Sequence, residues 1–539
     1  MLGMKPNLAP WPSIPAMLSQ NFVKYASREA VVDDDVRLTY KKLGRLVDDA
    51  ASALSAHDVS RGDRVVIWGP NSWQWIVAAL AIWRVGAVLV PLSTRLKPME
   101  LAPILRQSRC RMAFSARDGR GADLPSMLQN VEHQHDRNSG TSGFYPGQCV
   151  LFSQGEDTSP SRLTWDAFIQ SGRRSEASIC PAVDERDSCE IVFTSGSTDK
   201  PKGVMLSHGQ VIDSCWTLTK LRGRTPEDRQ LATSPFGHVL GLHACLLYSL
   251  VTGGALIISA ATRPDMMLAQ IKRERVSVLS GPPAMFERLM SESADAIGAL
   301  ENLRLIALIG APAKARSVQR LKKFAGNADI FIGYGMTEFL AITSTRKTDP
   351  IEVVASTVGR AVNGTEILIM GGDGNQVPAG HVGEIWVRGR YAMQGYLDDR
   401  KATEAKFSDD GWLKTGDLGL IASDGNLQIV GRQKEMYISF GFNVYPSEVE
   451  SLLMKSDLLD EIAIVPRSNA LAGEEGVAFV VPKTGIDFNA RSLLRWARKN
   501  IADYKVPRSV IEIEALPLNP AGKVCKKTLK QRLAADDAL

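Results

Sequence analysis

The chain has 539 residues, of which 44% are hydrophobic, 23% charged and 7% aromatic, a composition typical of a globular protein with two or more domains. The formal net charge is only +5, and no basic run alternates with aromatic residues, so the sequence does not indicate a nucleic-acid-binding protein. Seven scattered cysteines without a CxxC pair argue against a zinc site or a disulfide framework and favour a reducing, cytoplasmic setting.

Neither the N-terminal segment nor the most apolar stretch has the pattern of a targeting or membrane segment. The first residues, MLGMKPNLAPWPS, contain prolines where a signal peptide needs an apolar core. The most apolar stretch, Trp75–Leu92, is interrupted by Arg84 and Pro91, which favours a buried helix followed by a strand. We therefore expect a cytoplasmic protein without an integral membrane segment.

The first half of the chain alternates strand and helix patterns. The β-branched run 64–70, the helical pattern 71–85 and the apolar run 87–92 together predict a β-α-β unit. The same alternation predicts further elements in chain order: strand 254–259, helix 265–274, strand 276–282, helix 283–291, strand 303–310, helix 313–324 and strand 329–335. Repeated alternation of this kind predicts an α/β fold with parallel sheets and helices on both faces.

The pattern changes twice in the second half. From about Thr343 to Val430, short strands with frequent glycine turns predict a small antiparallel, β-barrel-like unit. After Arg432, the pattern predicts a compact α+β domain. We therefore expect a large N-terminal domain over 1–432 and a small, mobile C-terminal domain over 433–539.

One loop has an unusual composition. Hydroxyl residues, glycines and lysines concentrate in FTSGSTDKPKGVM, which spans Phe193–Met205 and has strand-like residues on both sides. Such a stretch fits a polar surface hairpin. It also fits a phosphate-binding loop, in which backbone N–H groups, hydroxyls and lysines surround an anion. It is not a Walker A loop, because Pro201 stands where the second glycine of that motif would be.

This loop resembles the phosphate loop of the adenylate-forming superfamily, which includes acyl-CoA synthetases, non-ribosomal peptide adenylation domains and luciferases. Four further motifs of that family follow in the family's order: YGMTE at 334–338, GWLKTGDLG at 411–419, GRQKEMYISFGFNVYPSEVE at 431–450 and LPLNPAGK at 516–523. The resemblance covers nearly the whole chain and favours the acyl-CoA synthetase branch.

The resemblance implies a reaction in two steps. A carboxylic acid and ATP form an acyl-adenylate and pyrophosphate, and the acyl group then passes to the thiol of CoA. A carboxylic acid is already ionised at neutral pH, so the first step needs positioning and charge neutralisation rather than a general base. The implied small molecules are the acid, ATP with Mg²⁺, and CoA. A homodimer is compatible with the sequence, although nothing in it indicates an oligomeric state.

The resemblance also implies roles for residues on the nucleotide side. The residues expected to hold the β- and γ-phosphates are Thr194, Ser195, Gly196, Ser197, Thr198, Lys200 and Lys202. Asp199 stands where the family usually has glycine, and an acid beside phosphates is unfavourable unless it points away. Tyr334 is expected to stack on adenine, next to the turn at Gly310 and Ala311, which resembles the family's adenine-side turn.

Further roles concern catalysis and the nucleotide's sugar. In YGMTE, Thr337 is expected to bond the α-phosphate and Glu338 to hold Mg²⁺, since hard cations prefer oxygen ligands. Asp417 is expected to bind the ribose hydroxyls, with Arg432 supporting it at the ribose and α-phosphate. Without the motifs, Glu338 would be interpreted as a solvated acid and Asp417 as part of a turn.

Three residues of the C-terminal region complete the set. Lys434 occupies the family's hinge position, where a few residues absorb the domain rotation. Lys523 is expected to bond the carboxylate and α-phosphate oxygens during adenylation; the alternative is an ordinary solvated lysine in a basic tail. Gly441 is expected to line the pantetheine tunnel, with apolar walls from Phe440 and Phe442.

The choice of acid and acceptor is less constrained. PFGHVLGL at Pro235–Leu242 matches the family segment beside the acyl pocket, with His238 at its usual place; a core histidine is the alternative. Ile332 stands where many relatives carry Gln, and no Asp for an α-amine occurs near Pro235, so we expect a hydrophobic medium- or long-chain fatty or ring-bearing acid. Delivery to a separate carrier-protein thiol or an amine is a second hypothesis. A non-catalytic nucleotide-binding protein is a third, although Lys523 and the acidic site residues are retained.

Overall fold

The computed structural model describes most of the chain: residues 8–96, 98–116, 125–128, 148–152, 162–174, 183–194, 201–259, 263–291, 300–310, 313, 315–439, 442–469, 473–501, 505–519 and 522–536. These residues form two compact units, one of Met1–Glu366 with Arg388–Gly411 and the other of Ile367–Val387 with Trp412–Leu539. The domain boundary expected after Arg432 is not decided by this division and stays a prediction.

The first unit contains a nine-stranded sheet. In sheet order its strands are β16 (Arg360–Ala361), β15 (Phe339–Ser344), β14 (Asp329–Met336), β13 (Leu305–Leu308), β12 (Val278–Gly281), β10 (Arg229–Ala232), β11 (Ala255–Ile258), β1 (Glu29–Asp33) and β2 (Val36–Thr39). The strands from β14 to β1 run parallel, which confirms the predicted α/β alternation. The edge strands β2, β15 and β16 are antiparallel.

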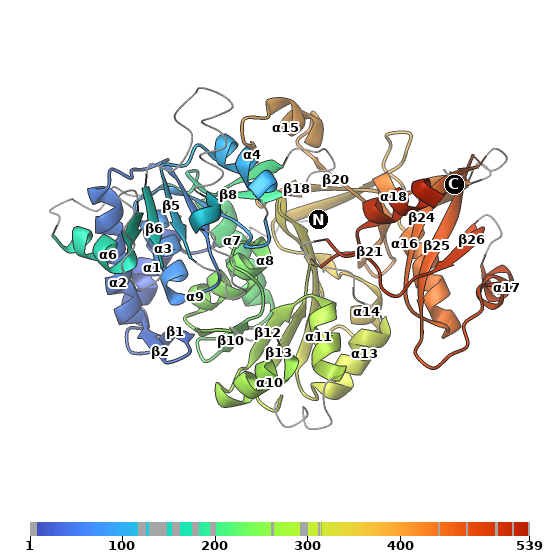
Figure 1. Ribbon diagram of the computed structural model, residues 1–539, viewed down its shortest axis with the longest axis horizontal. Coiled ribbons are helices and arrows are strands. Elements are labelled where there is room, and N and C mark those ends of the chain that lie inside the picture. The colour runs from blue at the N-terminus through green and yellow to red at the C-terminus, as the bar shows by residue number, and fades with distance from the viewer. Residues whose placement is uncertain are drawn as a thin grey trace. The chain divides into compact units, whose positions relative to one another are not determined.

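Helices cover one face of this sheet, as Figure 1 shows for α10, α11 and α13 beside β10, β12 and β13. The helices of this layer are α10 (Pro264–Arg273), α11 (Pro283–Ser291), α13 (Ala315–Phe324) and α14 (Ile351–Ser356). Their apolar residues, such as Ile271, Phe286 and Val318, pack with Leu279 and Ile306 of the strands into one buried core. Full burial of such side chains stabilises the unit by roughly 1.5–3 kcal/mol each.

The first unit also contains an eight-stranded sheet. In sheet order its strands are β19 (Gly395–Tyr396), β9 (Lys202–Ser207), β8 (Ser188–Thr194), β4 (Val88–Pro91), β3 (Arg64–Trp68), β5 (Met112–Ser115), β6 (Gln148–Leu151) and β7 (Arg162–Thr164). The strands from β8 to β7 are parallel, while β8, β9 and β19 pair antiparallel. Its helices are α1 (Ile14–Lys24), α2 (Tyr40–Ala56), α3 (Trp73–Arg84), α4 (Pro98–Ser108) and α6 (Trp165–Arg173).

The most apolar stretch forms a buried helix and a strand, as predicted. Ser72 caps α3 by accepting a hydrogen bond from the backbone N–H of Trp75, and every residue from Trp75 to Trp83 is buried. Among the described residues, none of the helices is both apolar and long enough to cross a bilayer.

Helix α7 (His208–Leu221) lies between the two sheets, because it contacts both β15 and β9. It begins with a capping box: the Ser207 hydroxyl accepts from the Gln210 N–H, and the Gln210 side chain accepts from the Ser207 N–H. The short elements after it are α8 (Val239–Gly241), the π-helix η1 (Leu242–Leu247) and α9 (Tyr248–Thr252). The capping box at Ser207 fixes the direction in which the chain leaves β9 and enters α7.

The second unit begins with a four-stranded antiparallel sheet in the order β17 (Thr365–Met370), β18 (Gly383–Gly389), β20 (Leu413–Ile421) and β21 (Leu427–Arg432). The antiparallel pairing expected for this region is confirmed. The barrel-like closure is not, since the strand order has two open ends. Two other strands of the same region instead join the sheets of the first unit: β16 pairs with β15, and β19 pairs with β9.

The rest of the second unit is an α+β layer structure, as predicted after Arg432. Its strands are β22 (Tyr437–Ser439), β23 (Phe442–Val444), β24 (Leu459–Asn469), β25 (Gly473–Pro482) and β26 (Ser509–Glu512). Its helices are η2 (Gln433–Glu435), α16 (Pro446–Leu453), η3 (Met454–Ser456), α17 (Ala490–Asn500) and α18 (Lys526–Asp536). Alternate residues of β24 face opposite cores: Ile464 packs with Leu453 and Leu493, whereas Val465 packs with Leu529.

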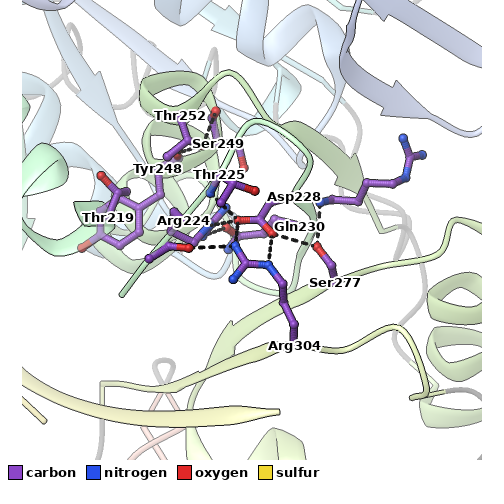
Figure 2. Close-up of polar contacts among 12 residues, drawn as sticks. Thr219, Arg224, Thr225, Asp228, Gln230, Tyr248, Ser249, Thr252, Ser277 and Arg304 are labelled. Carbon is purple, nitrogen blue, oxygen red and sulfur yellow. Dashed lines mark hydrogen bonds and ion pairs between the residues drawn. The ribbon is translucent and has the colours of Figure 1, made fainter. Parts of the chain in front are cut away.

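A buried charge cluster lies at the amino ends of β10, β12 and β13 (Figure 2). The carboxylate of Asp228, only 1% exposed, accepts hydrogen bonds from Arg224 (3.1 Å), Arg304 (2.7 Å) and the hydroxyl of Ser277 (3.1 Å). Burial by itself raises the pKa of Asp228, but hydrogen bonds and charge from Arg304 and Arg224 bring it below its usual value. The cluster therefore ties together the amino ends of these three strands. The segments of the candidate site follow the carboxyl ends of the same sheet.

Acid is expected to destabilise the protein through His208. This residue is fully buried, and neither imidazole nitrogen has a hydrogen-bond partner in the described part of the chain. Burial lowers the pKa of His208 to about 3, although the Asp187 carboxylate raises it slightly. The unfolded chain binds this proton below pH 6.5 and the folded chain does not, so stability falls as pH decreases through this window.

We expect urea unfolding of the wild type to show a loss of about 2 kcal/mol between pH 7 and pH 5 that is absent from His208→Phe. The exposed His381, replaced in the same way, serves as the matched control. Parallel pH dependence of all three proteins would show that His208 is not the group responsible.

Candidate active site

Three predicted segments leave the same edge of the nine-stranded sheet. The segment Pro235–Leu242 follows β10, Gly310 follows β13, and Tyr334 lies near the end of β14. Because the strands are parallel, their carboxyl ends share one edge, where α/β proteins commonly bind ligands. Gly310 has φ +87°, and a Cβ on it would lie 2.8 Å from the Leu240 side chain. The adenine-side turn and the acyl-side segment are therefore in contact.

His238 begins the short helix α8 on the acyl side. Its Nδ1 accepts a hydrogen bond from the N–H of Leu240 (3.2 Å), so in the neutral ring the proton is on Nε2. The side chain is exposed rather than packed in a core, which is contrary to the core-histidine alternative. Ile332, at the position where many relatives carry Gln, packs its side chain in the buried core with Leu308 and Ile330.

A side-chain contact links the π-helix η1, which follows the acyl-side segment, to β8, the strand that enters the phosphate loop. His243 Nε2 lies 2.7 Å from Oε1 of Glu190, and both side chains are buried. Glu190 is on β8, four residues before Thr194. On the other side, the Gln230 amide donates to the Ala244 carbonyl of η1 (2.7 Å). π-Helical turns occur frequently at functional sites. Sequence reasoning missed this connection, although an acid inside the apolar run SCEIVFT was a signal for it.

The phosphate loop connects two antiparallel strands. Thr194 ends β8 and Lys202 begins β9, and the two residues pair directly in the ladder. The Thr194 hydroxyl donates to the Lys202 carbonyl at 3.5 Å. Except for Pro201, the loop residues between them lie outside the described part of the chain, namely Ser195, Gly196, Ser197, Thr198, Asp199 and Lys200. The structure therefore locates the two ends of the loop, and the roles of its interior residues stay predictions.

The YGMTE motif forms the hairpin between β14 and β15. Tyr334 is half-buried on β14, and Thr337 and Glu338 make the turn. Glu338 Oε1 accepts a hydrogen bond from the phenol of Tyr396 at 2.9 Å. Lys202 Nζ lies 5.0 Å from the centroid of the same tyrosine ring. One tyrosine thus contacts both the phosphate-loop lysine and the predicted metal ligand.

Tyr396 was not predicted as a site residue. Burial raises the pKa of its phenol above the ordinary value, and the Glu338 carboxylate raises it further. The phenol is therefore a hydrogen-bond donor at neutral pH. Its neighbours come from distant segments, since β19 pairs with β9 and the Met393 N–H donates to the Glu338 carbonyl (2.8 Å). The sequence QGYLD carries no local sign of these contacts.

In the second unit, Asp417 and Arg432 pair directly across β20 and β21. Arg432 Nε donates to Asp417 Oδ1 at 3.0 Å, and the carboxylate is largely buried. The Asp417 N–H donates to the Thr415 hydroxyl (3.0 Å), which itself donates to the Ile385 carbonyl (2.7 Å). The predicted ribose ligand is therefore held by side-chain and main-chain contacts.

Lys523 lies close enough to this pair to be affected by its charges. The Lys523 N–H donates a hydrogen bond to Oδ1 of Asn519 at 2.9 Å. Although the side chain is solvent-exposed, surrounding protein lowers the pKa of Lys523; Arg432 lowers it further and Asp417 partly offsets this. The structure thus brings together three predicted residues within one unit. Ala311, Phe440, Gly441 and the side chains of Lys434 and Phe442 lie outside the described residues.

The donor set at Glu338 suits a divalent cation that also binds phosphate. In the described part of the chain, no three His, Cys, Asp or Glu side chains gather closely enough to hold a metal ion alone. With Oε1 bonded to the Tyr396 phenol, Oε2 is the carboxylate oxygen left for a cation. Mg²⁺ commonly binds through one or two carboxylates together with substrate phosphates and water. Glu338 therefore fits a Mg²⁺ ion that arrives with ATP.

Comparison with protein families matched two models to the chain. Residues 18–397 match the AMP-binding enzyme model, and residues 448–523 match the model of the AMP-binding enzyme C-terminal domain. The first match alone covers more than half of the sequence. The motifs quoted above fall within or between these two matches.

Individual relatives extend along the whole chain. A 7a-methyl-1,5-dioxo-octahydro-1H-inden-4-yl-propanoyl:CoA ligase of Rhodococcus jostii is 34% identical over 96% of this chain and 98% of its own. ATP-bound MatB from Rhodopseudomonas palustris is 26% identical, with a TM-score of 0.84 over 96% and 98% of the two chains. The amide bond synthetase McbA from Marinactinospora thermotolerans is 25% identical, with a TM-score of 0.83 over 96% and 99%.

Proposed function

The chain belongs to the AMP-binding enzymes, as an acyl-CoA ligase of the AMP-forming kind, and we propose that its substrate is a hydrophobic carboxylic acid built on fused rings. The observation that carries the choice of acid is the similarity to the ring-bearing propanoyl-CoA ligase, which extends along nearly the full length of both chains. Medium- and long-chain fatty acids are the alternative substrates.

The acyl-side segment supports an apolar acid. Phe236 is buried against Trp75, with ring centroids 5.2 Å apart. Val239 and Leu240 are half-buried, and the Leu240 side chain lies beside Gly310. No Asp or Glu occurs from residue 233 to residue 247, so this segment offers no carboxylate to a substrate amine. Burying an ammonium group without a carboxylate partner is costly, which disfavours amino acids.

In the first half-reaction we assign charge neutralisation and positioning to the site residues. A carboxylate oxygen of the acid attacks the α-phosphorus, the bond to the β-phosphate oxygen breaks, and pyrophosphate leaves. Lys202 faces the β- and γ-phosphates, Thr337 the α-phosphate and Asp417 the ribose. Lys523 donates to the oxygens on which charge changes. When bound at Glu338, Mg²⁺ supplies further positive charge to the triphosphate.

In the second half-reaction the thiol sulfur of CoA attacks the acyl carbon, AMP leaves, and the thiol proton passes to solvent. We further propose that the segment after Arg432 rotates between the two half-reactions about Lys434, and that Gly441 lines the path of pantetheine. Glycine suits such a path because it lets the backbone approach the ligand closely.

The test is carboxylate-dependent ATP–pyrophosphate exchange with fused-ring propanoates, aryl acids and fatty acids, followed by AMP release with and without CoA. We expect the fused-ring acids to give a kcat/KM at least ~10-fold above the other classes, which is about 1.4 kcal/mol of transition-state discrimination. We also expect CoA to stimulate AMP release.

Two results would change the proposal in different ways. Highest kcat/KM with a fatty acid would replace the fused-ring substrate with an aliphatic one. Exchange without any CoA effect would instead favour transfer to a separate carrier thiol, or to an amine as in the amide bond synthetase McbA.

A further inference from the structure

We propose that Tyr396 is a positioning residue for adenylation, because it couples the carboxylate of Glu338 to the ammonium group of Lys202. The inference rests on the proposed function, in which Glu338 binds a divalent cation and Lys202 faces the triphosphate. It assigns a role to a residue outside the family motifs recognised in the sequence.

The first contact is a directed hydrogen bond. The Tyr396 phenol donates to Oε1 of Glu338 at 2.9 Å, in a position where the tyrosine is only 6% exposed. A hydrogen bond to an ionised carboxylate in a desolvated place is stronger than one between neutral groups. It orients the carboxyl plane and leaves Oε2 for a cation.

The second contact uses the face of the same ring. Lys202 Nζ lies 5.0 Å from the ring centroid, within the range of a cation–π interaction. A flexible lysine side chain loses rotamer freedom when it binds a phosphate, and contact with an aromatic face removes part of that freedom beforehand. Lys202 thus contacts the same ring whose phenol binds Glu338.

The backbone around Tyr396 makes this arrangement rigid. The Met393 N–H donates to the Glu338 carbonyl (2.8 Å), and the Leu397 N–H donates to the Gly203 carbonyl (2.7 Å). The segment 393–397 therefore lies between the YGMTE turn and the strand that leaves the phosphate loop. The Tyr396 N–H also donates to the Thr403 hydroxyl (2.9 Å) on α15 (Arg400–Lys406). A change at either neighbour is transmitted to the other through this segment.

Tyr391 provides a matched control. It is also buried and lies just before the segment 393–397. Its phenol makes two hydrogen bonds, one with the Thr217 hydroxyl (2.9 Å) and one to the Asn363 carbonyl (2.6 Å). Neither partner is a predicted site residue. Tyr391→Phe and Tyr396→Phe thus remove the same hydroxyl group from two buried tyrosines. Only Tyr396→Phe removes a hydrogen bond to Glu338.

The experiment measures Mn²⁺ binding by electron paramagnetic resonance in the presence of a non-hydrolysable ATP analogue. Mn²⁺ prefers the same oxygen ligands as Mg²⁺. Loss of a hydrogen bond to a charged group is expected to raise the Mn²⁺ dissociation constant about tenfold in Tyr396→Phe. We expect Tyr391→Phe to bind Mn²⁺ like the wild type. Pyrophosphate exchange by Tyr396→Phe at limiting Mg²⁺ is expected to fall together with the cation affinity, whereas exchange by Tyr391→Phe is expected to stay at the wild-type level.

Two further variants separate the contacts. In a Glu338→Gln background, Tyr396→Phe is expected to have no additional effect on Mn²⁺ binding, because the coupled partner is already lost. Tyr396→Leu also removes the ring face, and we expect it to raise the KM for ATP roughly fivefold beyond Tyr396→Phe. Thermal unfolding without ligands shows whether each variant is folded.

Wild-type Mn²⁺ affinity in Tyr396→Phe, or equal weakening in Tyr391→Phe, would overturn the inference and leave Tyr396 as an ordinary core tyrosine. Because this measurement needs no acid substrate, it also separates the two proposals. Failure of exchange with every acid would reject the proposed function, whereas the Mn²⁺ comparison would still decide the role of Tyr396.

Discussion

Lys523→Ala is expected to lower the kcat/KM of adenylation by about 10³, while thiolysis of a supplied acyl-adenylate changes by less than about threefold. The ammonium group lies within the influence of Asp417 and Arg432, the predicted ribose and α-phosphate residues. Removing a preorganised donor at the reacting phosphate has an effect of this size in other enzymes. Charge does not build up on the α-phosphate in the same way when the thiol attacks the acyl carbon.

The measurement uses two assays on one preparation: pyrophosphate exchange for the first half-reaction, and CoA-dependent release of AMP from synthetic acyl-adenylate for the second. Lys530→Ala is the matched control, since Lys530 is an exposed lysine of the same C-terminal stretch. If both half-reactions fall equally in Lys523→Ala, the lysine supports the fold or both steps, and the assignment to adenylation is wrong.

Much of the fold was predictable because its signals are local. The run Asn71–Val85 predicts a helix by its apolar pattern, and α3 occupies Trp73–Arg84. The strand 329–335 was also predicted, and β14 extends over it. Sheet membership was not predictable, because it depends on contacts between distant segments. The sequence predicts one small β unit for the glycine-rich region after Thr343. In the structure, β16 and β19 of this region pair with strands of two larger sheets.

The candidate site shows the same division. Motif residues such as Asp417 and Glu338 are predicted from the resemblance of short, local motifs, and their roles stay predictions. Tyr396 is not predicted because its contacts, with Glu338 and Lys202, are made to segments far away in the chain. Ile332 is used to predict a hydrophobic acid because it stands where many relatives carry Gln. The alternation of β14 directs Ile330 and Ile332 to one face and Phe331 to the other, and the sequence DIFIG does not say which face is the core.

Asp417→Asn is expected to lower kcat/KM for ATP by about 10², because the role we propose for this carboxylate is to accept hydrogen bonds from both ribose hydroxyls, and each bond to a charged group contributes about 1.5–3 kcal/mol. The asparagine retains one carbonyl oxygen, so part of the binding survives. The backbone conformation at residue 417 is expected to be retained, since its N–H still donates to the Thr415 hydroxyl.

The decisive comparison uses 2′,3′-dideoxy-ATP, which lacks both hydroxyls. Wild type and Asp417→Asn are expected to use this analogue with kcat/KM values within about threefold, because the contacts that distinguish the two proteins are absent. Asp424→Asn, an exposed substitution in the turn between the same two strands, controls for changes in that hairpin. An equal loss with ATP and with the dideoxy analogue would mean that Asp417 acts through Arg432, its partner at 3.0 Å, rather than by contact with the ribose.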